Sequence, residues 1–375
     1  MPESISIYVH IPYCISKCNY CGFYSVPLAG CDVKPLLKAL IKELDSYKLD
    51  IPAETIYIGG GSPSCIGTDN LLWLIDNLNA RLGKAKEFTV EINPGQLDSI
   101  ALKQIRQKGV NRISMGAQSF IDQQLIALGR RYNADAIYKA VASAKAAGFD
   151  NISLDTIFAL PGQNLNQLQY NLQQLISLDI NHVSAYSLSY DPGTPMTAAL
   201  EKGDIIPADE ELDLQMYKLA IEMLNNAGLK QYETSNFAKG SYRCEHNLVY
   251  WQGGQYLGIG PAAGSFYRMN RTENTADIAR YVQAIEADCP AFTQSQQIEP
   301  LQYACQIAIV MLRLIDGIDI EKFKQLTDYD PLSLFKDVID EHVARGLVEV
   351  DAHNIKLSQQ GQLIADTIMA DFILY

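Results

Sequence analysis

The sequence has no apolar run long enough to cross a membrane, and it has fewer basic than acidic side chains. The longest apolar run of its C-terminal third, 307–312, ends at Arg313 and is far shorter than the roughly 20 residues of a membrane-spanning helix. Forty-three acidic against 30 basic residues give a net charge of −13, which argues against general nucleic-acid binding. No basic segment precedes the apolar stretch 5–9, so we expect no signal peptide and a cytoplasmic protein.

Histidine is also scarce, with five residues in 375, whereas eight cysteines are present. Three of them, Cys14, Cys18 and Cys21, form a C-x3-C-x2-C cluster, and the other five are scattered. A structural zinc site needs four ligands, so zinc would require His10 or a remote residue as well. Thiolates also hold iron–sulfur clusters, and three of them leave one iron of a four-iron cluster open. S-adenosylmethionine (SAM) can chelate that iron, and the spacing resembles that of the radical SAM superfamily.

Short β-branched runs alternate with amphipathic stretches from residue 5 to about residue 190, which predicts repeated βα units. The expected strands are 5–11, 55–59, 87–92, 112–116, 152–159 and 183–188, and the expected helices are 35–47, 71–81, 101–108, 134–147 and 165–178. The strands look apolar on both faces, which is typical of a parallel sheet covered by helices. Six units predict an α/β fold with an incomplete or complete barrel.

In such a barrel the chemistry gathers at the carboxyl ends of the strands, and the distinctive short motifs fall there. The cysteines follow the first strand, and Gly59-Gly60-Gly61-Ser62-Pro63 follows the second. Glu91, Gln118 and Asp155 lie at or near the ends of the next three strands. A long helix over about 209–226 and a Gly- and Tyr-rich stretch follow, and the tail reads as helix 337–345, strands 347–350 and 355–358 and helix 361–372, an order like that of a winged helix.

Several longer motifs resemble the oxygen-independent coproporphyrinogen III oxidase family, over about residues 5–350. They are 8–14 (YVHIPYC), 18–21 (CNYC), 59–64 (GGGSPS), 91–94 (EINP), 109–114 (GVNRIS), 116–120 (GAQSF), 128–130 (LGR), 160–163 (LPGQ), 246–251 (HNLVYW) and 257–260 (LGIG). Together with the strand pattern, the resemblance implies an incomplete (β/α)6 TIM-like radical SAM barrel over 1–230. A connecting segment, 231–295, and a mostly helical, winged-helix-like C-terminal domain, 296–375, would follow.

Two branches of that family differ in function, and three features of this sequence separate them. The dehydrogenase branch has a fourth cysteine where this chain has Phe23, and it has a long extension before its first strand. The segment 246–251 resembles the signature of the other branch, HemW, which is regarded as a heme chaperone. We therefore expect a heme chaperone, with coproporphyrinogen III dehydrogenase as the alternative and a radical SAM enzyme for an unrelated substrate as a third hypothesis.

The resemblance also implies cofactors and residues. Cys14, Cys18 and Cys21 would hold a [4Fe–4S] cluster with SAM on its open iron. The first SAM position would be lined by Tyr8, Tyr20, Gly60 and Glu91. Residues matching a second SAM position are Gly61, Ser62, Gln118, Arg130, Asp155 and Ser189. Two departures from the branch are small: Gly22 replaces a common Asp, and Ser62 replaces the usual Thr.

Heme is the third expected cofactor, and heme iron takes His, Cys, Met or Tyr as axial ligands. His246 is the candidate ligand because Cys244, Tyr250 and Trp251 surround it with a second ligand type and two flat rings. The alternative is that His246 and Trp251 only fix an irregular loop against the barrel, while His10 packs near the cluster. The expected partner is a heme-accepting protein, such as a respiratory cytochrome, for which the acidic surface would favour a basic docking patch.

Overall fold

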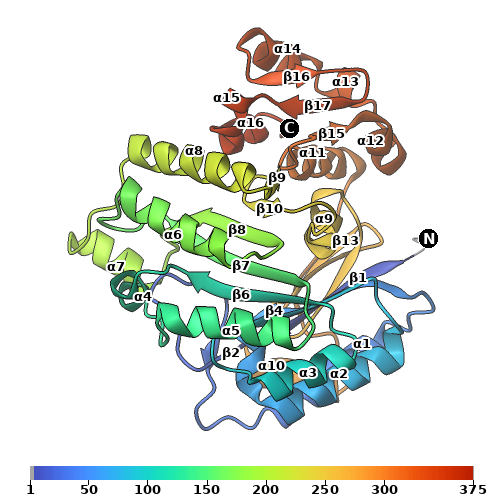
Figure 1. Cartoon of the computed structure of the whole chain (residues 1–375). Helices are drawn as coiled ribbons and strands as arrows, with labels where there is room; N and C mark the ends of the chain where they lie inside the picture. Colours follow the sequence, from blue (N-terminus) through green and yellow to red (C-terminus); the bar gives the residue numbers. More distant parts are fainter. Residues whose placement is uncertain (1–3, 375) are drawn as a thin grey trace.

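The computed structural model describes residues 4–374, and within them a 12-stranded sheet forms the body of the molecule (Figure 1). Its centre is a run of six strands in the order β1-β4-β5-β6-β7-β8, each pair of neighbours parallel. These are β1 (Ile5–Ile11), β4 (Ala53–Gly60), β5 (Glu87–Ile92), β6 (Arg112–Gln118), β7 (Asn151–Phe158) and β8 (His182–Ser187). The six expected strands are therefore confirmed, with ends that differ by at most two residues.

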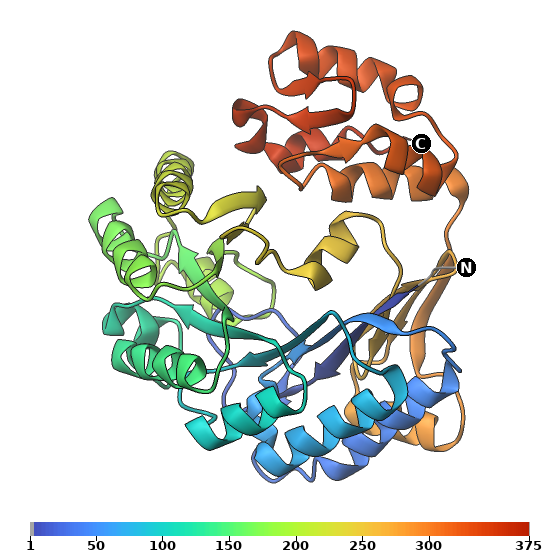
Figure 2. The same cartoon turned by 45° about the vertical axis from the view of Figure 1, so that its right-hand side comes forward.

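Helices cover the convex face of the curved sheet, as an incomplete (β/α)6 barrel requires (Figures 1 and 2). They are α1 (Lys34–Ser46), α2 (Thr68–Leu82), α3 (Ser99–Gln107), α4 (Asp122–Ala127), α5 (Ala134–Ala146), α6 (Leu165–Ser177), α7 (Pro195–Lys202), α8 (Glu210–Asn226) and α10 (Ile278–Glu286). Side-chain caps fix several of their starts: Asp98, Asn133 and Asn164 each accept a backbone N–H of the first turn.

The two faces of the central strands differ, so the expectation that both are apolar is wrong. Residues of the helix-covered face, such as Phe88, Val90 and Ile92 in β5, belong to the main hydrophobic core. Their neighbours along the strand, such as Glu87 and Glu91, point to the concave interior. The same alternation runs through all six strands, and the inward positions are mostly polar. Those toward the carboxyl ends line cavities, whereas Ser6, Thr55 and Glu87 form hydrogen bonds within the protein beside α9.

Shorter strands extend the sheet at both edges. On one side β8 pairs with β10 (Asn236–Ala238), which pairs with β9 (Lys230–Glu233). On the other side β1 pairs in parallel with β11 (Tyr256–Ile259), followed by antiparallel β12 (Gly264–Tyr267), β13 (Asn270–Asn274) and β14 (Phe292–Gln297). The short helix α9 (Glu245–Trp251) lies inside the curve of the sheet (Figure 2).

The C-terminal part has its own hydrophobic cluster, centred on Phe323, Phe335 and Phe372. It contains α11 (Pro300–Met311), α12 (Ile320–Thr327), α13 (Pro331–Leu334), α14 (Lys336–Ala344) and a small sheet of β15 (Ile318–Asp319), β17 (Asn354–Leu357) and β16 (Val348–Val350). The helix expected over 361–372 is instead two short helices, α15 (Gln359–Gln362) and α16 (Ala365–Ala370), because the backbone leaves helical geometry at Ile364. Among residues 4–374, no helix has both the length and the hydropathy to span a membrane.

Candidate functional site

The three clustered cysteines lie at the carboxyl-terminal mouth of the barrel. Cys14 ends the short strand β2 (Tyr13–Cys14), which pairs with β3 (Val26–Pro27), and the other two follow in the loop between them. All three line one cavity of about 160 Å³ together with Gly60, Gly61 and Glu91. Burial raises the pKa of the Cys14 and Cys21 thiols. A bound metal would be needed to keep such thiols ionised at neutral pH.

The spacing of these thiols in space suits a cluster better than a single ion. Within residues 4–374, no three His, Cys, Asp or Glu side chains converge closely enough to ligate one metal ion. A four-iron cluster binds each thiolate at a different iron, so its ligands surround a volume and do not meet at a point. Gly61 lets the cysteine loop approach β4 closely, because a Cβ there would lie 2.5 Å from the Tyr13 carbonyl oxygen and 3.1 Å from the Cys14 Sγ. The donor set therefore fits a [4Fe–4S] cluster.

Glu91 and the glycine triplet face each other at the ends of β5 and β4. The Tyr57 hydroxyl donates to Glu91 Oε1 at 2.7 Å, and the Gly60 N–H donates to Glu91 Oε2 at 3.1 Å. A Cβ at Gly59 would lie 2.9 Å from the Glu91 carboxyl carbon, so only glycine allows this approach. Burial raises the pKa of Glu91 to about 7, although its bond to Tyr57 opposes the shift. The carboxylate can accept further hydrogen bonds from hydroxyl or ammonium groups in the cavity.

Tyr8 and His10 support the same end of the barrel from β1. Tyr8 Oη lies 2.9 Å from His10 Nδ1, and His10 Nε2 lies 3.0 Å from the Tyr24 carbonyl oxygen. His10 is 5% exposed, and a Cβ at Gly60 would lie 2.6 Å from its ring. His10 thus packs beside the cysteine loop, as the sequence indicated.

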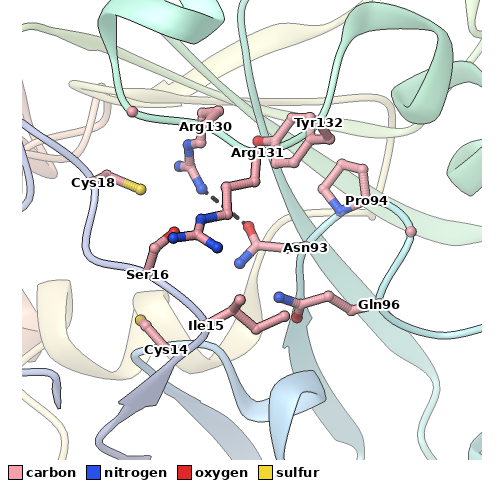
Figure 3. Close-up of a pocket in the computed structure, with 12 residues that line it drawn as sticks. Cys14, Ile15, Ser16, Cys18, Asn93, Pro94, Gln96, Arg130, Arg131 and Tyr132 are labelled. Atoms are coloured by element: carbon pink, nitrogen blue, oxygen red, sulfur yellow. Dashed lines mark hydrogen bonds between the residues drawn. The ribbon is translucent and has the colours of Figure 1, made fainter. Parts of the chain in front are cut away.

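Asn93, which is not among the expected site residues, links Arg130 to Ser62 through hydrogen bonds. Arg130 Nη1 donates to Asn93 Oδ1 at 3.0 Å, and its Nη2 donates to the Tyr20 hydroxyl; Figure 3 shows the pair with Asn93. Asn93 Nδ2 in turn donates to Ser62 Oγ at 2.9 Å, and Ser62 Oγ donates to Gln96 Oε1 at 2.6 Å. The sequence signal for Asn93 was its place in the 91–94 motif.

A larger cavity of about 440 Å³ adjoins the cysteine loop and reaches deeper into the barrel. Six expected residues line it: Tyr20, Cys21, Glu91, Gln118, Asp155 and Ser189. Gln118 sits at a register shift of β6 with a positive φ of 66°, which turns the strand end. The lining also includes Tyr57, Ser184 and Tyr186, which the sequence did not single out. Arg112 and Asn247 line it as well and lie within the motifs 109–114 and 246–251.

The segment expected to bind heme lies at the opposite, amino-terminal end of the barrel interior. His246 is 1% exposed, its Nδ1 lies 2.6 Å from Thr55 Oγ1, and its Nε2 lies 2.8 Å from Tyr250 Oη. Burial lowers the pKa of His246 to about 3. Both ring nitrogens are engaged, so in this conformation His246 has no free nitrogen for iron.

The rest of the segment is also committed to packing. Glu87 accepts the N–H groups of Glu245 and His246, each at 3.1 Å, and so caps the start of α9. Burial raises the pKa of the Cys244 thiol to about 12, and its Sγ lies 3.6 Å from Glu87 Oε1. The Trp251 ring stacks under the Arg313 guanidinium at 4.6 Å and so contacts the C-terminal part. Of this segment, Asn247 is the residue that lines the large cavity.

Barrel, cysteine loop and Glu91 together define a protein of the radical SAM class, and residues 8–175 match the Radical SAM superfamily. Residues 306–364 match the HemN C-terminal domain. The chain is 32% identical over 374 residues to the heme chaperone HemW of Bacillus subtilis, covering 98% of this chain and 99% of that protein. It is 31% identical over 385 residues to HemW of Escherichia coli, with 98% of each chain covered. The chain belongs to the HemW family.

A solved structure supports the fold along the whole chain. The coproporphyrinogen III oxidase HemN from Escherichia coli, a radical SAM enzyme, superposes with a TM-score of 0.84. The alignment covers 99% of this chain and 90% of HemN, at 21% identity. At that identity the likeness establishes the shared architecture of barrel and C-terminal part.

Proposed function

We propose that this protein is a heme chaperone that binds heme, a [4Fe–4S] cluster and SAM, and that it transfers heme to an acceptor such as a respiratory cytochrome. The observation that carries the proposal is its likeness to HemW heme chaperones over 98% of the chain. The mouth of the barrel supports it, because three thiols, Glu91 and the glycine triplet line one cavity there.

Cys14, Cys18 and Cys21 would hold the cluster, which when bound supplies an electron for cleavage of SAM. The chain's own residues position SAM. Glu91 accepts hydrogen bonds from the ligand, and Gly60 lets it approach the backbone. Tyr8 and Tyr20 complete this first position. Residues assigned to a second SAM position are Gly61, Ser62, Gln118, Arg130, Asp155 and Ser189.

For heme, we retain His246, Tyr250 and Trp251 as proposed contacts, with a condition set by the geometry. The hydrogen bonds of His246 to Thr55 and Tyr250 must break before its nitrogens can reach iron. Heme ligation by His246 therefore requires α9 to move out of the barrel interior.

Titration of hemin into the reconstituted protein tests the proposal. We expect a Soret band that saturates at a defined stoichiometry, and transfer of heme to an apo-cytochrome that slows as salt screens the acidic surface. Absence of saturable hemin binding would contradict the chaperone function, whereas salt-independent transfer would contradict only the electrostatic docking.

The second candidate function is coproporphyrinogen III dehydrogenase, favoured by the HemN-like fold and the continuous polar interior. Against it stands Phe23, which occupies the position of the dehydrogenase's fourth cysteine and is 72% exposed. Reconstituted protein supplied anaerobically with SAM and coproporphyrinogen III distinguishes the two: we expect no protoporphyrinogen IX. SAM cleavage without any porphyrin substrate would instead favour an unrelated radical SAM reaction.

We further propose the division of the chain into a barrel domain, 1–230, a connecting segment, 231–295, and a C-terminal domain, 296–375. The separate hydrophobic clusters support the boundary before the C-terminal domain, whereas Leu257 and Tyr281 of the connecting segment belong to the cluster of the barrel. Limited proteolysis should then cut first between the two clusters.

A further inference from the structure

Arg112 is a buried charge whose hydrogen-bonding capacity the protein does not fill. It begins β6, points into the barrel interior and is 2% exposed. Nη2 lies 3.4 Å from His182 Nδ1, but Nε and Nη1 have no partner among the described residues. Unmet buried donors of a charged group are costly, because their loss of hydration is not repaid by a hydrogen bond within the protein. Arg112 lines the 440 Å³ cavity, so these donors are available to a ligand there.

The acidic side chains nearby are already committed to other donors. Glu87 caps α9, and Glu91 accepts from Tyr57 and from the Gly60 backbone. Burial raises the pKa of Asp155, and the neighbouring Ser184 and Ser114 hydroxyls oppose that shift. These carboxylates balance the charge of Arg112 without occupying its free N–H groups.

Other polar side chains converge on the same cavity. Asn247 reaches it from α9, and Ser184 and Ser189 reach it from β8 and the loop that follows. A guanidinium can bind a carboxylate through two parallel hydrogen bonds, and amide and hydroxyl groups can complete its coordination. The cavity lies in the lower half of the ~300–1,000 Å³ range of small-molecule sites, which suits a carboxylate-bearing arm of a ligand.

We propose that Arg112, with Asn247, forms a subsite for a ligand carboxylate in the barrel interior. In naming candidate ligands this inference rests on the proposed function: a propionate of heme and the amino-acid carboxylate of a SAM molecule share the required chemistry. Arg112 thereby becomes a binding residue, and Asn247 links the 246–251 segment to the ligand without ligation by His246.

The first arm of the test changes the ligand and leaves the protein intact. Hemin and hemin dimethyl ester are titrated into the reconstituted wild-type protein. A charge-assisted bidentate pair predicts about 10-fold or more weaker binding of the ester. Since no substitution is involved, this comparison does not depend on whether an Arg112 variant folds.

The second arm uses Arg112→Lys, which keeps the charge but loses the two-pronged geometry, with Arg106→Lys on the outer helix α3 as the matched control. Thermal melts establish that both variants fold. We expect the preference for hemin over its ester to shrink several-fold in Arg112→Lys and to persist in the control. Equilibrium dialysis of SAM against the same proteins shows whether Arg112→Lys loses bound SAM.

The outcomes distinguish a heme propionate from the carboxylate of SAM as the ligand, and they distinguish failure of the subsite from failure of the proposed function. A hemin-over-ester preference that depends on Arg112 assigns the subsite to a propionate, and an Arg112-dependent loss of SAM assigns it to the amino-acid carboxylate. If neither depends on Arg112, the subsite is disproved and Arg112 serves only as a structural counter-ion. If wild-type protein binds neither hemin nor its ester, the proposed function fails, while the SAM measurement still reports on Arg112.

Discussion

The two ends of the barrel interior use the same kind of side chain for opposite purposes. At the carboxyl-terminal end, Glu91 and the three cysteines line cavities. At the amino-terminal end, Glu87 lies four residues before Glu91 in the same strand, and its two oxygens accept backbone N–H groups at the start of α9. The carboxyl-terminal end holds open cavities, whereas a helix of the chain itself, α9, packs into the amino-terminal end.

The difference teaches that polarity of an inward residue does not mark it as functional. His246 and Tyr250 are polar, aromatic and within a conspicuous motif, but they bond to each other and to β4. Glu91 is also buried, but its carboxylate lines a cavity and can accept further hydrogen bonds from a ligand there. What separates the two ends is whether a partner inside the protein already fills each donor and acceptor.

The largest expected effect is at the open end. Replacing Cys14 by Ala removes one of three thiols, and we expect iron bound after anaerobic reconstitution to fall from about four per chain to below about one. Iron analysis and visible absorption measure it. The matched control is Cys289→Ala, a thiol on the surface, which should retain full iron. Equal iron in both variants would remove the cysteine loop as the cluster site.

At the closed end, Glu87→Ala should affect stability. The change strands the N–H groups of Glu245 and His246, so we expect the free energy of unfolding to fall by about 3 kcal/mol. Urea unfolding measures it, with exposed Glu54→Ala as a control expected to change stability by less than about 0.5 kcal/mol. Similar losses for the two variants would mean that α9 does not close the barrel.

At the same end of the barrel, His246→Ala should reduce the free energy of unfolding by less than Glu87→Ala does. It removes two buried hydrogen bonds, and we expect a loss of about 2 kcal/mol in apo-protein, against less than about 0.5 kcal/mol for exposed His353→Ala. The Soret spectrum of hemin bound to each variant is the second readout. A spectral change confined to His246→Ala would show that α9 opens and that this histidine ligates heme.

The smallest effect concerns pH and compares Glu91 with Glu43, a buried carboxylate outside the site. Burial raises the pKa of each to about 7, against an ordinary value of 4.5. The folded state then binds more protons than the unfolded state between about pH 4.5 and pH 7. The free energy of unfolding therefore falls as pH rises through that window, and above about pH 7 these two groups cause no further fall.

Glu91→Gln and Glu43→Gln should each flatten part of this slope in urea unfolding. Only Glu91→Gln should also weaken SAM binding, because Glu43 bonds to Tyr281, Asn274 and Gly260 and lines neither of the two cavities beside the cysteine loop. SAM binding that responds equally to both substitutions would contradict the role of Glu91.

Much of the fold could be predicted from the sequence because its signals are local. Apolar, β-branched runs alternating with amphipathic stretches located the six central strands within two residues. The prediction of one helix over 361–372 was wrong because the backbone leaves helical geometry at Ile364, where the sequence has no proline or glycine to signal a break. The inner faces of the strands were misjudged for a similar reason: a cavity that tolerates Glu, Ser and Tyr exists only once the sheet curves.

By itself the sequence determined the cysteine spacing, the motifs at the strand ends and the family, since these are written in consecutive residues. Only the tertiary structure decided which polar side chains remain unsatisfied. It placed His246 in a closed network, and it turned Arg112, 130 residues or more from the heme motif along the chain, toward the cavity that Asn247 also lines. Hydrogen-bond satisfaction joins residues distant in sequence, and for that reason no local pattern can reveal it.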